Sequence, residues 1–324
     1  MTPPDAPHAI PAGSTIVRSK TLERLRLVFG GLQRVSPTLA ARVAGELFRR
    51  PRRHARPERE VAWEATAERI ELPYEPPRGA SRRSPRSLSA LSWGTGPTVL
   101  LQHGWEGRAS QMGAFAAPLV ARGFRVVALD APAHGNSGGK SSSMIEFAAG
   151  LRAAGQALGP AHAVVGHSLG AAATSLALRE GLDAERLVFV APPYDLDAYF
   201  ALFLELLGLG PEVHARMVAG YERHFACRWD DLRRVTAAGD DRPLLVVHDA
   251  DDQETPLSAG RAVAEAWTRG ALHATAGLGH LRVLRSRAVV ERVADALGDA
   301  SAPLRRSGGE RQAHREHDAT VHRP

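Results

Sequence analysis

The 324-residue chain has few of the features that mark disulfide-bonded, secreted or membrane proteins. Its one cysteine, Cys227, excludes an internal disulfide, and no glycine-rich turn surrounds this residue to make it a nucleophile. No apolar run approaches the ~20 residues that span a bilayer. The first twenty residues lack the apolar core of a secretory signal. We therefore expect a cytoplasmic protein without a transmembrane segment.

Lysine is also scarce, since only Lys20 and Lys140 occur, and the net charge of +6 is carried almost wholly by arginine. Five arginines gather in residues 49–56, a cluster that suits contact with nucleic acid or anionic lipid. No aromatic residue interleaves with them, and no nucleic-acid motif accompanies them. We interpret this stretch as a solvated linker at a helix end, and we expect no nucleic-acid partner.

What remains is the composition of an ordinary globular protein, with 44% hydrophobic and 23% charged residues. The order of the patterns predicts three parts. Residues 1–60 form an N-terminal extension with two amphipathic helices, and residues 61–300 form the main domain. Residues 301–324 are polar and predict a disordered tail, whose histidines offer no preorganised metal site. No pattern indicates an oligomeric state.

Short apolar segments alternate with helical ones from about residue 61. This alternation predicts an α/β fold, with a mostly parallel eight-stranded sheet flanked by helices. A short connection rich in proline and arginine joins the first two strands, which favours an antiparallel start. The expected strands are 68–74, 88–93, 98–103, 125–130, 162–167, 186–191, 243–249 and 270–275. The expected helices between the later strands are 111–122, 143–157, 169–180, 258–268 and 283–297.

One interval, residues 193–240, interrupts this rhythm with two or three helices and no clear strand. Residues 198–209 are apolar nearly all round, and a helix with that pattern must bury most of its surface. The position of the interval between two strands favours a helical cap over a cleft. The alternative is a set of helices that simply packs on the body of the protein.

Residues 166–170 read G-x-S-x-G, with an apolar β-branched run before them and an alanine-rich helix former after them. A serine on such a strand-to-helix turn presents its hydroxyl above the sheet. Glycines on either side remove the Cβ atoms that would collide in the turn. The pattern predicts that Ser168 is a nucleophile; the alternative is a small residue that fills a tight turn.

A serine hydroxyl needs a neighbouring base, and the base needs an orienting carboxylate. In this setting the expected chain order is serine, acid, histidine. His280, in a glycine-flanked loop ahead of the last helix, is the predicted base. Three aspartates that follow one strand compete for the role of the acid. Asp252 fits best and Asp251 is second, whereas Asp249 is placed to accept hydrogen bonds from backbone amides of the turn.

Acyl transfer also requires donors for the negative charge that develops on the carbonyl oxygen. One donor should be the N–H of Leu169, the residue after the nucleophile. The other should come from the loop after the strand at 98–103, where Gly104 permits close approach and Trp105 is the candidate donor.

Other titratable residues lie near these segments. Asp195 or Asp197, after the strand at 186–191, is a rival acid. The remaining residues are interpreted as structural because the serine has better-placed partners; they are Asp130, His134, His103, His167 and His248.

Five segments in this order together resemble the α/β-hydrolase superfamily, over residues 68–298. They read H-G-W, D-x-P-x-H-G-N-S, G-H-S-L-G, D-x-D-D-x-x-x-P and G-x-G-H. Residues 193–240 match the place where this superfamily inserts its cap. The loop reads H-G-W-E, which does not favour the branch of esterases with H-G-G-G. A serine nucleophile sets the chain apart from the dehalogenases and epoxide hydrolases, which use aspartate.

By this resemblance Ser168 matches the nucleophile, Asp252 the acid and His280 the base. The N–H groups of Trp105 and Leu169 match the oxyanion donors. The resemblance implies a serine hydrolase of the carboxylesterase kind. We expect neither a cofactor nor a metal to take part.

The first hypothesis is hydrolysis of a carboxylic ester of a small apolar substrate through an acyl-enzyme. A second hypothesis keeps the triad and changes the bond to a thioester, an amide or a carbon–carbon bond. In that case the arginines favour a phosphorylated carrier such as coenzyme A. A third hypothesis is a non-catalytic binding protein on a hydrolase scaffold, against which the complete set of triad candidates argues.

Overall fold

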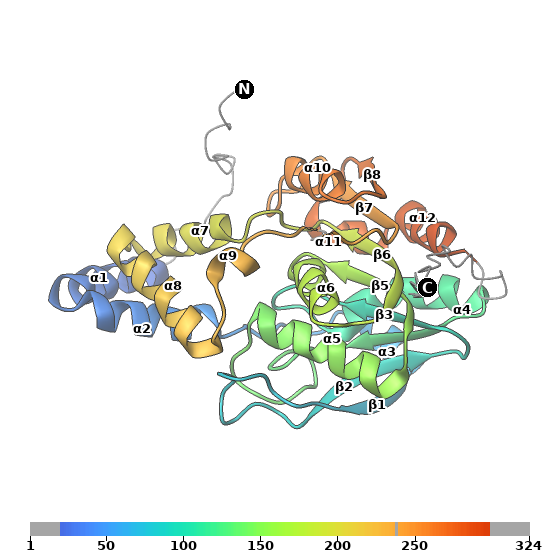
Figure 1. The fold of residues 1–324 in the computed structure, drawn as a ribbon, viewed down its shortest axis with the longest axis horizontal. Helices are drawn as coiled ribbons and strands as arrows, with labels where there is room; N and C mark the ends of the chain where they lie inside the picture. Colours follow the sequence, from blue (N-terminus) through green and yellow to red (C-terminus); the bar gives the residue numbers. More distant parts are fainter. Residues whose placement is uncertain (1–19, 237–238, 299–324) are drawn as a thin grey trace, which may run out of the picture.

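The computed structural model describes residues 20–236 and 239–298 (Figure 1). The predicted tail at 301–324 lies outside these ranges, as do residues 1–19 of the predicted extension. The strands are β1 (Glu68–Pro73), β2 (Ser87–Trp93), β3 (Thr98–Gln102), β4 (Arg125–Leu129), β5 (Ala161–His167), β6 (Ala184–Val190), β7 (Leu244–Asp249) and β8 (Gly270–Thr275).

The α-helices are α1 (Lys20–Val35), α2 (Pro37–Phe48), α3 (Glu58–Ala65), α4 (Ala116–Ala121), α5 (Met144–Leu158), α6 (Leu169–Arg179), α7 (Asp197–Leu207), α8 (Pro211–Phe225), α9 (Trp229–Leu232), α10 (Leu257–Glu265), α11 (Gly279–Arg282) and α12 (Arg287–Leu297). Two 3₁₀ segments, η1 (Ala109–Phe115) and η2 (Val283–Arg285), precede α4 and α12. None of these helices is long and apolar enough to cross a membrane.

The strands form one eight-stranded sheet in the order β1-β2-β4-β3-β5-β6-β7-β8. β1 pairs antiparallel with β2, and β2 pairs antiparallel with β4, whereas the remaining pairs are parallel. The predicted fold class and its antiparallel start are therefore confirmed. Since β3, β5 and β7 are parallel, their carboxyl ends meet at one edge of the sheet, where the loops that follow them can cooperate.

Helices cover both faces of the sheet, as the apolar runs of the central strands require. On one face α5, α6 and α10 pack around a core that includes Val164 and Phe189. On the other face η1, α4 and α12 pack around Val165 and Val247. Because neighbouring residues of a strand point to opposite faces, Val164 and Val165 belong to different cores.

Three local predictions were wrong. The helix expected at 111–122 is a 3₁₀ segment followed by α4, because Pro118 is tolerated only in the first turn of an α-helix. The helix expected at 283–297 begins as η2. Helix α3, directly after the arginine-rich stretch, was missed, although Pro57 and the acidic residues Glu58 and Glu60 mark its start.

The helices between β6 and β7 pack with the N-terminal helices, and Figure 1 shows α1, α2, α7 and α8 grouped at one end of the molecule. Phe48 of α2 lies edge-on to Phe200 and Phe203 of α7, at ring-centroid distances of 4.8 and 5.0 Å. Packing of α7 against α2 explains why residues 198–209 are apolar nearly all round. A role of these helices as a cap over the cleft stays a prediction.

The contact between α6 and the end of β3 requires glycine at position 170. A Cβ atom there would lie 2.5 Å from the carbonyl oxygens of both Gln102 and His103. We predict that Gly170→Ala lowers the free energy of unfolding by about 1–3 kcal/mol, because the backbone must shift. Gly45→Ala is the matched control, since its Cβ meets nothing within 4 Å and should stabilise α2 by ~0.5–1 kcal/mol. Urea unfolding measures both; equal stability of Gly170→Ala and wild type would contradict the contact.

Candidate active site

Ser168 occupies the tight turn between β5 and α6, and its backbone has a positive φ angle. Its φ of 51° and ψ of −121° are uncommon for a residue with a side chain. The Ser168 N–H donates to the Val190 carbonyl at 2.9 Å, which ties the start of the turn to the end of the neighbouring strand β6. A Cβ on Gly166 would lie 2.7 Å from the Cα of Ala171, so glycine is needed there for the same turn. The sequence motif thus corresponds to a strained strand-to-helix turn with the serine at its apex.

His280 and Asp252 form a buried pair on the loops after β8 and β7. The Nδ1–H of His280 donates to Oδ2 of Asp252 at 2.7 Å. The other oxygen of Asp252 accepts from the N–H groups of Glu254 and Thr255, at 2.8 and 2.9 Å. These bonds fix the carboxylate, which in turn fixes the tautomer of the imidazole, so that Nε2, 3.7 Å from Oε2 of Glu254, is the ring nitrogen that can accept a proton.

Two opposing effects act on the pKa of His280. Burial acts to lower this pKa, whereas the hydrogen bond and the charge of Asp252 act to raise it, and Glu254 adds to the increase. The net effect raises the pKa of His280 above its ordinary value of 6.5. A raised pKa makes the imidazole a stronger proton acceptor, as a general base requires.

His167, the residue before the serine, ties His280 to the turn. The His167 Nε2–H donates to the His280 carbonyl at 3.1 Å, and the two rings lie 4.7 Å apart. Complete burial lowers the pKa of His167 well below its ordinary value, so the ring is neutral at pH 7. Within residues 20–236 and 239–298, no hydrogen bond joins the Ser168 hydroxyl to the His280 ring. Catalytic hydrogen bonds are often long without substrate and shorten when it binds.

Asp249 and Asp251, the two other candidate acids, connect the acid loop to the histidine loop. Asp249 accepts from the N–H groups of Gly279 and Leu278 at 2.8 and 3.1 Å. Asp251 accepts from the Gly277 N–H at 2.7 Å. Burial acts to raise the pKa of Asp249, but the hydrogen bonds outweigh it and lower this pKa. Both carboxylates are therefore engaged in holding the loop that carries the imidazole.

The remaining rival acids are also engaged elsewhere. Asp195 accepts from the Asp197 N–H at 2.9 Å, and Asp197 accepts from the indole N–H of Trp229 at 2.7 Å. His248, a histidine next to these acids, donates from Nε2 to the carbonyl of Thr255 at 2.9 Å and so supports the acid loop. Of the candidate acids, Asp252 is the one whose hydrogen bond reaches His280.

The candidate oxyanion loop after β3 lies directly against the serine. A Cβ on Gly104 would be 3.0 Å from the Cβ of Ser168. His103 orders this loop, because its Nε2 accepts from the Ala131 N–H at 3.1 Å while Nδ1–H donates to the Gly104 carbonyl at 2.6 Å. Trp105 packs against the rings of His134 and Phe147, at centroid distances of 5.1 and 6.4 Å, and these two rings also contact each other at 5.0 Å.

Leu169 is the first residue of α6, and the first N–H groups of an α-helix have no acceptor within the helix. The helix dipole adds partial positive charge at this end. The Leu169 N–H is thus suited to donate a hydrogen bond to an oxygen on which negative charge develops.

Asp130, predicted to be structural, accepts from the N–H groups of Ala109 and Asn136, at 2.7 and 2.8 Å.

The arginine-rich stretch at 49–56 follows the end of α2 and is largely exposed, as expected of a solvated linker, but its arginines also bind groups of the main domain. The backbone N–H and the guanidinium of Arg52 both donate to the carboxylate of Glu106, the residue after Trp105. Arg108, at the other end of the same turn, donates to Glu60 of α3 at 2.6 Å. The N-terminal segment therefore supports the candidate oxyanion loop. These partners are 54 and 48 residues apart in sequence, so no local pattern announces them.

Comparison with known families matches residues 98–293 to the Alpha/beta hydrolase family. The chain belongs to this family. The match includes the serine turn and both loops of the buried pair, and it excludes α1, α2 and α3. A comparison with curated proteins found no match.

Solved structures of this family's fold resemble the protein at low sequence identity. An esterase of Pyrococcus furiosus is 20% identical, with a TM-score of 0.55 over 77% of this chain and 96% of its own. The esterase RhEst1 from Rhodococcus sp. ECU1013 is 19% identical, with a TM-score of 0.51 over 72% and 98%. A bromoperoxidase from Bacillus anthracis is 17% identical, with a TM-score of 0.52 over 71% and 99%. At these identities the likeness concerns the fold.

The described part of this hydrolase contains no group of three or more His, Cys, Asp or Glu side chains arranged to hold a metal ion. The chemistry that the site can perform with its own groups is proton transfer at His280 next to a serine hydroxyl.

The raised pKa of His280 depends on Asp252 and can be measured without any substrate. We predict that the imidazole titrates above 6.5 in wild type. In Asp252→Asn the hydrogen-bonded negative charge is lost while burial continues to act, so the pKa should fall relative to wild type. NMR titration measures both values, and the spectrum of His280→Gln assigns the signal. Asp295→Asn, on α12, is the remote control; a His280 pKa that does not respond to Asp252→Asn would refute the coupling.

Proposed function

We propose that the protein is a serine hydrolase that cleaves a carboxylic ester of a small apolar substrate through an acyl-enzyme. The observation that carries this proposal is the buried Asp252–His280 pair, tied through His167 to the strained turn of Ser168. A nucleophile, a base and an orienting carboxylate in this chain order form the set that acyl transfer requires.

In the proposed reaction the Ser168 Oγ attacks the ester carbonyl while Nε2 of His280 takes the hydroxyl proton. The tetrahedral intermediate then releases the alcohol, which receives that proton from His280, and an acyl-serine remains. Water attacks the acyl group and gives a proton to His280. Collapse returns this proton to Ser168 and releases the carboxylic acid. Asp252 stabilises the imidazolium at each of these stages.

The negative charge on the tetrahedral oxygen needs fixed donors. We propose the N–H groups of Leu169 and Trp105 for this role. The first position of α6 and the close approach of Gly104 to Ser168 support the assignment. One such donor is typically worth ~2.7–4 kcal/mol of the activation barrier.

An apolar group in the substrate agrees with the side chains around the serine turn. Trp105 and Leu169 are partly buried and pack on the same apolar core as Tyr194 and Leu196, which follow β6. The hydroxyl of Tyr199 in α7 meets Oγ1 of Thr255 in the acid loop at 2.7 Å. The inserted helices therefore reach the loop that carries Asp252, which supports their proposed role as a cap.

Removal of the nucleophile tests this proposal. Ser168→Ala should reduce the kcat/KM for 4-nitrophenyl esters of short fatty acids by at least ~10³-fold, because no acyl-enzyme can form. Ser258→Ala, an exposed serine on α10, is the control and should keep full activity. Turnover that survives in pure Ser168→Ala protein would sink the assignment.

A further inference from the structure

A cavity of about 200 Å³ lies beside the oxyanion loop, on the side formed by the N-terminal segment. Four arginines line it, together with His54 and Glu106; they are Arg52, Arg53, Arg56 and Arg108. Such a density of guanidinium groups in one small hollow is suited to carboxylate or phosphate groups. None of the groups in the proposed reaction at Ser168 lies in this cavity.

The cavity already holds one carboxylate, that of Glu106. Arg52 donates from Nε to Oε1 at 2.9 Å and from Nη2 to Oε2 at 3.0 Å, while His54 approaches Oε2 at 3.2 Å. Burial acts to raise the pKa of Glu106, but the hydrogen bonds from Arg52 and His54 outweigh it and lower this pKa. Arg52 and His54 therefore favour a negatively charged group at this place in the cavity.

The arginines differ in how their charge is balanced. Arg52 pairs with Glu106, and Arg56 with Glu64 at 2.9 Å. Arg108 pairs with Glu60 at 2.6 Å. These three cations are thus compensated by carboxylates.

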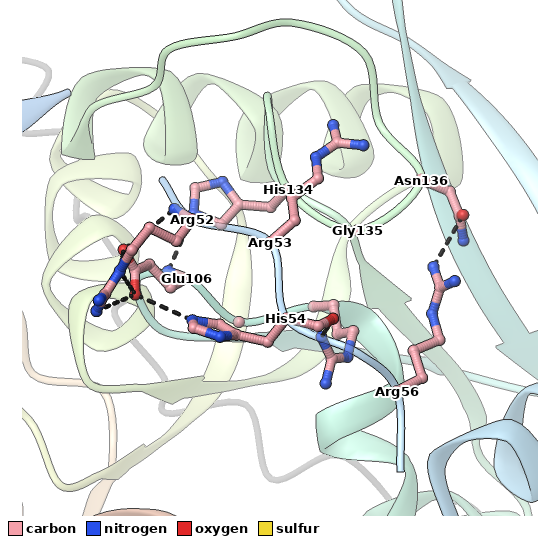
Figure 2. A pocket seen from close by; sticks show the side chains of 10 residues that line it. Arg52, Arg53, His54, Arg56, Glu106, His134, Gly135 and Asn136 are labelled. Carbon is pink, nitrogen blue, oxygen red and sulfur yellow. Dashed lines mark hydrogen bonds and ion pairs between the residues drawn. The ribbon is translucent and has the colours of Figure 1, made fainter. Parts of the chain in front are cut away.

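Arg53 is the exception. Within the two described ranges it has no acidic partner, and its Nη2 donates only to the carbonyls of Ser137 and Ala133, at 3.1 and 3.4 Å. Figure 2 shows its guanidinium extending away from the Glu106 carboxylate that Arg52 and His54 approach. An arginine has five N–H donors, so Arg53 keeps donors for a ligand.

His134, on the wall of the cavity, carries no charge at neutral pH. Burial is the main cause that lowers the pKa of His134 to about 4, and Arg53 contributes in the same direction. The ring is therefore neutral at pH 7, and its Nε2 accepts from the Glu106 N–H at 3.2 Å. The net positive charge of the cavity comes from Arg53.

The cavity is close enough to Ser168 to be occupied by part of its substrate. A Cβ atom added to Gly104 would lie 3.0 Å from the Cβ of Ser168, and Glu106 follows Gly104 by only two residues. Since consecutive Cα atoms are about 3.8 Å apart, the Cα atom of Glu106 lies at most about 12 Å from the Cβ of the serine. A chain of six to eight bonds covers most of this upper limit.

We propose that this cavity binds an anionic group of the substrate, a carboxylate or a phosphate, with Arg53 as the principal cation. The preferred substrates are then esters with an apolar segment between the scissile carbonyl and a terminal negative charge. This inference rests on the proposed ester hydrolysis at Ser168.

Matched pairs of 4-nitrophenyl esters test the preference directly. Each pair has the same chain length, one member ending in a methyl group and the other in a carboxylate: butanoate with succinate, hexanoate with adipate, octanoate with suberate. A further arm replaces the terminal carboxylate by a phosphonate, which distinguishes the two kinds of anion. For at least one length, kcat/KM should favour the charged member.

In Arg53→Gln this charged-to-neutral ratio of kcat/KM should fall by about tenfold, which is the lower end of what a charge-assisted hydrogen bond contributes. Arg53→Lys should recover part of the ratio, because it keeps the charge. Arg59→Gln removes an exposed arginine of α3 outside the cavity and is the matched control. Equal loss of activity toward both members in Arg53→Gln, or no loss, would overturn the proposal.

A binding measurement separates this inference from the proposed reaction. Titration calorimetry of Ser168→Ala with adipate, and with inorganic phosphate, should show binding of at least one anion that weakens about tenfold when Arg53→Gln is added. Binding without turnover of any ester would refute the hydrolase proposal and leave the anion site standing. Ester turnover without charge preference and without anion binding would refute the anion site alone.

Discussion

The close approach of two backbones at the serine turn is the constraint on which the rest of the site depends. Gly170 of α6 sits against the carbonyls of Gln102 and His103, where a Cβ would meet both oxygens at 2.5 Å. This contact fixes α6 relative to the end of β3. It also brings Gly104 against Ser168, so that the proposed nucleophile, the first N–H groups of α6 and the proposed oxyanion loop lie close together.

Buried carboxylates then connect the surrounding loops to this turn. Asp252 and Asp249 each accept backbone N–H groups, and Asp249 holds the glycines that carry His280. Burying such charges is costly unless hydrogen bonds compensate them, and here each bond also orders a loop. Glu106 does the same for the oxyanion loop, with partners from the N-terminal segment. The proposed catalytic groups are thus held in place by charge-assisted hydrogen bonds.

The parts that the sequence predicts are those with local signals. Alternating strand and helix patterns predict the sheet, and glycines around Ser168 predict the turn, because periodicity and steric limits act over a few residues. The packing of α7 on α2 and the pairing of Arg52 with Glu106 are not predictable in this way. They join segments far apart in the chain, and an exposed arginine looks the same whether it meets water or a carboxylate.

The central claim is that Ser168 is an activated nucleophile, and covalent labelling tests it most directly. A fluorophosphonate reacts with a serine hydroxyl whose proton a neighbouring base can remove. After reaction of the pure protein and proteolysis, mass spectrometry identifies the modified residue. Our account predicts one adduct, on Ser168, whose rate of formation rises with pH through the pKa of His280. An unlabelled Ser168, or an adduct on a different serine, would contradict it.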